Sequence, residues 1–224
     1  MVSVSVGQLG GARVGSALLA CVAENGSGSH DYPLSEELLK GPHAARNLAD
    51  VVHFLCMLHG RQPGVIDHAS NRSADPASRA WFNAAIQQFG IERAILTRLA
   101  VAVGPIPSTA GAGDTESAVI GQRHAIEMLA QSERNGCALG AALAVALDWR
   151  HVRAVLDTAA LRFGIEVPPY TLGEPTSIRE TAEAVATAPS VERAMLFGAE
   201  QIVVQHFGLW DLLEARQQAR AATA

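Results

Sequence analysis

Prolines divide this chain into uninterrupted segments that are too long to be β-strands. The longest runs without proline cover residues 1–32, 77–104, 108–167 and 190–224. They contain most of the 40 alanines, together with many leucine, glutamate, glutamine and arginine residues, all of which have good helix propensity. Strands in globular proteins are usually about 3 to 10 residues long. The sequence therefore predicts an all-α fold.

Start and stop signals give the boundaries of the expected helices. Proline follows an N-capping aspartate at Asp75-Pro76, and Pro189-Ser190 opens the last segment. Ser177 and Glu180 form a capping-box pattern for a short helix. Besides this short helix, we expect helices at about residues 8–24, 35–40, 43–60, 76–103, 115–135, 137–164 and 189–216. Asp114 or Thr115 is the expected cap of the helix at 115–135, and Gly90 is the expected site of a kink in the helix at 76–103.

Five of these helices are long enough to span a bundle from end to end. The short connection near residue 136 makes the helices on either side of it antiparallel neighbours. We expect one domain over residues 1–224, an up-down helical bundle with its core in residues 42–216 and an N-terminal helix and loop in residues 1–33.

The composition limits the kinds of partner that the protein can bind and the cellular compartment that we expect for it. The net charge of −5 comes from scattered side chains, which argues against a nucleic-acid surface. Three separated cysteines predict a cytoplasmic protein without disulfides. The longest uncharged apolar run, residues 135–147, is shorter than the roughly 20 residues of a membrane span. Residues 13–21 have the outline of a short export signal, which leaves that alternative to an N-terminal helix open.

Catalytic motifs of the common kinds are absent from the sequence, so buried polar residues are the main guide to a site. At about 100° per residue, four ionisable side chains from four helices project toward apolar faces: His59, Glu92, Asp148 and His206. They are our candidates for a ligand or metal site. The alternative is that they bond to one another, to backbone groups or to arginines such as Arg98 or Arg150.

Other polar residues at similar spacing point away from the apolar faces. Asp50 and His53 form an Asp-x-x-His pair opposite the stripe of their helix, and we expect both to be solvated. His124 and Glu127 are expected on a wet face. In the second Asp-x-x-His pair, Asp148 lies near the middle of the apolar face and His151 at its edge.

The long helices and the inward carboxylates and histidines resemble a ferritin-like bundle. Residues 43–72 and 121–163 also resemble an uncharacterised family of bacterial, alphaproteobacterial-type helical proteins. Ferritin-like di-iron sites carry Glu-x-x-His on two helices, and this sequence contains no Glu-x-x-His. The resemblance thus implies a ferritin-like fold without an intact di-iron motif.

Three functions compete. The leading hypothesis is a non-catalytic bundle that assembles with itself, as a homodimer, or binds an unknown protein partner, because Phe197, Val204 and Phe207 lie off the buried face of the last helix. This hypothesis expects no cofactor. The second is a ferritin-like metal-dependent oxidoreductase that holds iron or manganese with the four candidates. The third is a binder of a small apolar ligand between helices.

Overall fold

A computed structural model describes residues 6–73, 75–109 and 111–222, and every regular element in this part of the chain is helical. The predicted all-α class is confirmed. The α-helices are α1 (Val6–Asn25), α2 (Glu36–Leu39), α3 (Ala44–His59), α4 (Val65–Arg72), α5 (Pro76–Ala102), α6 (Ala112–Ala130), α7 (Cys137–Arg162), α8 (Pro175–Val185) and α9 (Pro189–Ala221). Two short 3-10 turns, η1 (Ser27–Ser29) and η2 (Tyr32–Leu34), follow α1.

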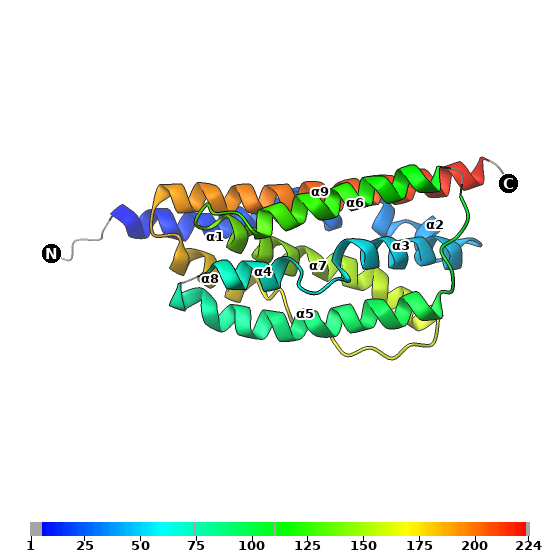
Figure 1. The fold of residues 1–224 in the computed structure, drawn as a ribbon, viewed down its shortest axis with the longest axis horizontal. Coiled ribbons are helices and arrows are strands. Elements are labelled where there is room, and N and C mark those ends of the chain that lie inside the picture. Colours follow the sequence, from blue (N-terminus) through cyan, green and yellow to red (C-terminus); the bar gives the residue numbers. More distant parts are fainter. Residues whose placement is uncertain (1–5, 74, 110, 223–224) are drawn as a thin grey trace.

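The long helices run along one axis and form an elongated bundle (Figure 1). Helix α7 lies in its centre and packs against α9 most extensively, and also against α1, α3, α4, α5, α6 and α8. Residues 137–149 of α7 are buried on every side, which is typical of a central core helix. This explains the long uncharged run in the sequence. Among the described residues, every helix is too short or too polar to cross a lipid bilayer.

Helices α7 and α9 approach so closely that glycine is required at their contact. A Cβ atom added to Gly140 would lie 2.6 Å from the carbonyl carbon of Met195, and closer still to its oxygen. On the facing helix, a Cβ atom added to Gly198 would lie 3.0 Å from the backbone nitrogen of Ala141. The two backbones are therefore in direct contact, and this fixes the position of α9 against the core helix.

Local signals placed most helix ends within a few residues. Asp75 caps α5, with its side chain accepting a hydrogen bond from the backbone N–H of Ala77 at 2.8 Å. Helix α5 continues through Gly90 without a break. The expected cap of α6 at Asp114 or Thr115 is wrong, because the helix starts at Ala112 after Gly111, whose φ of 73° is left-handed.

Three other helices differ from expectation, two in a boundary and one because it was not predicted at all. Helix α8 begins at Pro175 rather than Ser177, because proline is favoured in the first turn of a helix. Helix α9 extends past the expected end at Arg216 to Ala221. Helix α4, of 8 residues, was not predicted from the sequence, because it lacks a strong start signal.

Candidate functional site

A continuous chain of buried polar side chains crosses the middle of the bundle. His59, the last residue of α3, faces His206 of α9 with 2.9 Å between their Nε2 atoms. The Nδ1 atom of His206 lies 2.6 Å from Oδ2 of Asp148, in the middle of α7. Asp148 in turn accepts hydrogen bonds from the Ser27 backbone N–H at 2.7 Å and from its hydroxyl at 2.6 Å. All four residues are at most 5% exposed.

The carboxylate of Asp148 fixes how protons are placed along this chain. Burial raises the pKa of Asp148, but the hydrogen bonds from His206 and Ser27 outweigh it and hold the pKa below its ordinary value. Because the ionised carboxylate only accepts, Nδ1–H of His206 donates to it. When His206 is neutral, its Nε2 atom accepts the proton of His59 Nε2–H. Burial, followed by the neighbouring His206 and Arg93, lowers the pKa of His59 well below its ordinary value.

Glu92 lies beside this chain and is neutralised by arginine. Its Oε2 accepts the indole N–H of Trp149 at 2.9 Å, and its Oε1 accepts from Nη1 of Arg153 at 2.6 Å. Burial raises the pKa of Glu92, although the hydrogen bonds from Trp149 and Arg153 oppose the shift. Arg153 also bonds Asp157 and the carbonyl of Pro168. Glu92 thus pairs with Arg153 and not with the arginines suggested by the sequence.

The structure brings three of the four sequence candidates into direct contact and places the fourth one side chain away. His59, His206 and Asp148 are consecutive in the chain, and the ring of Trp149 connects them to Glu92 by packing edge-on against His59 at 5.3 Å. The carboxylate oxygens already accept hydrogen bonds. Within the described residues, no group of three histidine, cysteine, aspartate or glutamate side chains is arranged to hold a metal ion.

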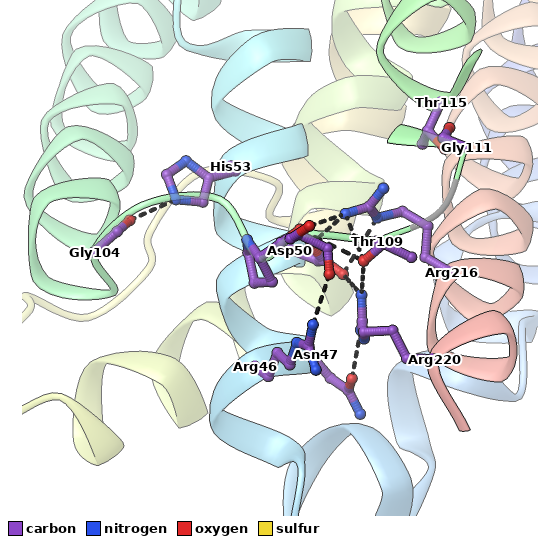
Figure 2. A network of polar contacts seen from close by, with 12 residues as sticks. Arg46, Asn47, Asp50, His53, Gly104, Thr109, Gly111, Thr115, Arg216 and Arg220 are labelled. Atoms are coloured by element: carbon purple, nitrogen blue, oxygen red, sulfur yellow. Dashed lines mark hydrogen bonds and ion pairs between the residues drawn. The ribbon is translucent and has the colours of Figure 1, made fainter. Parts of the chain in front are cut away.

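A second buried network was missed by the sequence analysis (Figure 2). Asp50 of α3 is 1% exposed, so the prediction that it is solvated is wrong. It accepts hydrogen bonds from Arg216 at 3.0 and 3.3 Å and from Arg220, both on α9. Arg220 also donates to Asn47 Oδ1 at 2.7 Å, and both arginines donate to the hydroxyl of Thr109. Two guanidinium groups therefore compensate one buried carboxylate.

The partner of Asp50 in its sequence motif has a different environment. His53 is half-buried rather than solvated, and its Nε2 lies 2.8 Å from the carbonyl oxygen of Gly104 (Figure 2). The sequence of α9 contains a pattern that could have predicted the burial of the two arginines. Leu209, Leu213, Arg216 and Arg220 follow one another at spacings of three and four residues, so both arginines continue its buried stripe.

The fold and its buried polar chain define the class of protein: an all-helical bundle whose ionisable core groups mainly satisfy one another. Comparison of sequences gives the family. The chain belongs to the family of unknown function DUF6975, whose profile matches residues 22–221. No curated protein and no solved structure matches the chain.

Proposed function

We propose that this protein is a non-catalytic helical bundle that acts by association, and that two copies pair through the outer face of α9. A row of side chains that alternates at spacings of four and three residues carries the proposal. We call it the α9 seam, and its members are Arg193, Phe197, Glu200, Val204, Phe207 and Asp211. This spacing keeps all six within about 40° of one line along the helix and is the pattern of a coiled-coil contact.

Three of the four side chains at the centre of the α9 seam are apolar, and the fourth, Glu200, is charged and exposed. Val204 is 56% exposed and Phe197 39% exposed, while Phe207 is half-buried. The opposite face of α9 packs against α7, while at one end of the seam Phe207 and Asp211 also contact His30 of the same chain, with ring centroids 4.6 Å apart and 3.1 Å between Nε2 of His30 and Oδ1 of Asp211. Apolar side chains aligned on the outside of a helix are characteristic of a surface that binds another protein.

Charges at the two ends of the seam favour a second copy as the partner. Arg193 lies at one end and Asp211 at the other, both exposed. If two α9 helices pack antiparallel about a two-fold axis near residue 202, Arg193 of each faces Asp211 of its partner and Phe197 faces Phe207. Within one chain the two charged residues are about 27 Å apart along the helix, too far to interact. The seam is therefore self-complementary only in this orientation.

Substitutions in the seam test the proposal by sedimentation velocity and light scattering over a range of concentrations. We expect the wild-type chain to form a dimer and Val204→Glu to dissociate it, because the new carboxylate would face the like-charged Glu200 of the second copy across the two-fold axis. Leu161→Glu is the matched control, since Leu161 is 85% exposed on α7 and outside the seam. A wild-type chain that is monomeric at every concentration would contradict the proposal.

A charge exchange tests the antiparallel orientation. Arg193→Asp and Asp211→Arg should each weaken the dimer, because each places like charges opposite one another. The double variant should recover at least half of the lost association free energy, since it restores opposite charges across the two-fold axis. Recovery cannot arise within one chain, because the two positions are too far apart. A double variant weaker than both single variants would rule out this orientation.

The alternative proposal is a ferritin-like protein with an atypical iron or manganese centre. Its support is that His59, Asp148 and His206 come together from three helices. Against it, each of these side chains is already engaged with its neighbour, and a metal would have to displace those hydrogen bonds. Elemental analysis of protein purified without chelator decides between them. We expect less than about a tenth of an equivalent of transition metal, whereas a stoichiometric metal would favour the alternative.

A further inference from the structure

A hollow of about 620 Å³ opens on the surface between the end of α1, η1 and the middle of α9. Part of its lining belongs to the α9 seam, and the rest comes from outside that helix. We call it the α9–η1 hollow, and its lining consists of Val204, Phe207, Gly208 and Asp211 of α9 and of Glu24, Asn25 and Ser29. The hollow therefore lies at one end of the surface through which two copies are proposed to pair.

The α9 residues of the hollow have the spacing of a coiled-coil hole. In a coiled coil, a side chain of one helix inserts between four residues of the facing helix. Counted from Val204, the four lining residues of α9 stand at positions i, i+3, i+4 and i+7, which is the set that surrounds one inserted side chain. The volume lies in the range of small-molecule pockets, so an aromatic ring fits.

His30 supports two walls of the hollow from inside the same chain. It is 5% exposed, and its ring packs against that of Phe207. Its Nδ1 accepts the backbone N–H of Tyr32 at 3.0 Å, so the proton is on Nε2 and is donated to Oδ1 of Asp211. Within the described residues Oδ2 of Asp211 forms no hydrogen bond. The hollow is thus preformed, and one oxygen on its rim is available to a partner.

The rim of the hollow is acidic. Glu24 and Asp211 are both exposed, and no arginine, lysine or histidine is among the lining residues. In the described part of the chain, Glu24 forms no ion pair. An apolar floor formed by Val204 and Phe207 under two carboxylates fits an apolar side chain that is flanked by positive charges.

The other end of the α9 seam carries such a side chain. Phe197 is 39% exposed, and the guanidinium of Arg134 lies over its ring at 5.7 Å. Arg134 comes from the loop between α6 and α7, and Arg193 lies one turn of α9 before Phe197. Both arginines are exposed, and neither forms an ion pair with another described residue. One chain therefore presents both an apolar ring with two cations and a hollow with two anions.

We propose that the ring of Phe197 of each copy inserts into the α9–η1 hollow of the other, and that Arg134 pairs with Glu24 across the contact. This inference rests on the proposed dimer, whose two-fold axis near residue 202 places Phe197 opposite Phe207, in the middle of the hole. It extends the interface from α9 to the end of α1, to η1 and to the α6–α7 loop. The partner is thus selected by the fit of a ring into a hollow as well as by the seam.

Asn25→Arg tests whether the hollow is occupied, with dimerisation measured by sedimentation velocity over a range of concentrations. Asn25 is exposed at the end of α1 and lies outside the seam, so the fold should be retained, which circular dichroism checks. The dissociation constant of the dimer should rise by about tenfold, because the new side chain obstructs the hollow and repels the incoming arginines. Asn71→Arg, at an exposed position on α4, is the matched control and should leave the constant unchanged.

The outcomes separate this inference from the dimer itself. A wild-type dimer whose dissociation constant is the same in Asn25→Arg and in Asn71→Arg would overturn the insertion of Phe197 and leave pairing through the seam in place. A wild-type chain that is monomeric at every concentration would overturn both.

A charge exchange outside α9 tests the pairing of Arg134 with Glu24. Glu24→Arg and Arg134→Glu should each weaken the dimer, because each places like charges together at both symmetric contacts. The double variant should recover at least half of the lost association free energy, since it restores opposite charges between the copies. A double variant weaker than both single variants would refute this pairing and with it the proposed insertion.

Discussion

The close contact between α7 and α9 makes the effect of a glycine-to-alanine substitution on stability depend strongly on where the glycine lies. Gly140→Ala places a methyl group 2.6 Å from the carbonyl carbon of Met195, where ordinary contact needs about 3.4 Å or more. The obstacle is backbone, which cannot turn aside as a side chain can. The helices must therefore separate by about 1 Å, and a gap of that size forfeits a quarter to a half of the dispersion energy of the contacts it opens.

The magnitude follows from two opposing effects. Overpacking of a close-packed core costs about 1 to 3 kcal/mol, and the rigid obstacle here places Gly140→Ala near the upper end. Alanine is better than glycine in a helix by about 0.5 to 1 kcal/mol. We therefore expect a net loss of about 2 kcal/mol in the free energy of unfolding, which for a chain of this size lowers Tm by about 4 to 8 °C.

Gly90→Ala and Gly121→Ala are matched controls, because both glycines lie inside helices with nothing within 4 Å of an added Cβ atom. The same change there should raise stability by about 0.5 to 1 kcal/mol. Urea unfolding followed by circular dichroism measures all three variants. A Gly140→Ala variant as stable as the wild type, or stabilised like the controls, would refute the close approach of α7 and α9.

Three further predictions concern the buried polar networks. Asp50→Asn leaves two buried guanidinium groups without a compensating charge, so it should lower the free energy of unfolding, measured with urea, by about 3 to 5 kcal/mol. Asp31→Asn, at an exposed site, is the control and should lower it by less than about 0.5 kcal/mol. Because burial lowers the pKa of His59, its contribution to the free energy of unfolding is fully present above the unfolded pKa of about 6.5 and is lost as the pH falls below it; this part of the pH dependence should be absent in His59→Gln. Gly26→Ala should destabilise the chain and disturb the histidine signals in NMR spectra, because its methyl group would collide with Asp148.

The parts of the fold that sequence predicted well depend on local chemistry. Aspartate before proline starts α5, and Pro189 opens α9, because capping and a fixed φ act within one turn of helix. Helix α4 was missed since its cap involves the side chain of Asp67 bonding the N–H of Gly64, and glycine offers no capping side chain of its own. The extension of α9 to Ala221 was missed because arginines held by tertiary ion pairs stabilise the last turns.

The two Asp-x-x-His pairs show why the sequence predicted the burial of Asp148 but not that of Asp50. Asp148 lies in the middle of an apolar stripe, so the helical period alone brings it into the core. Asp50 lies off the main stripe of α3 and is buried because α9 passes on that side and supplies Arg216 and Arg220. Helical period indicates which side of a helix is apolar, but a polar side becomes interior when a neighbouring helix brings the opposite charge. Burial of such a residue is a property of the pair of helices, and it becomes predictable only when both are considered together.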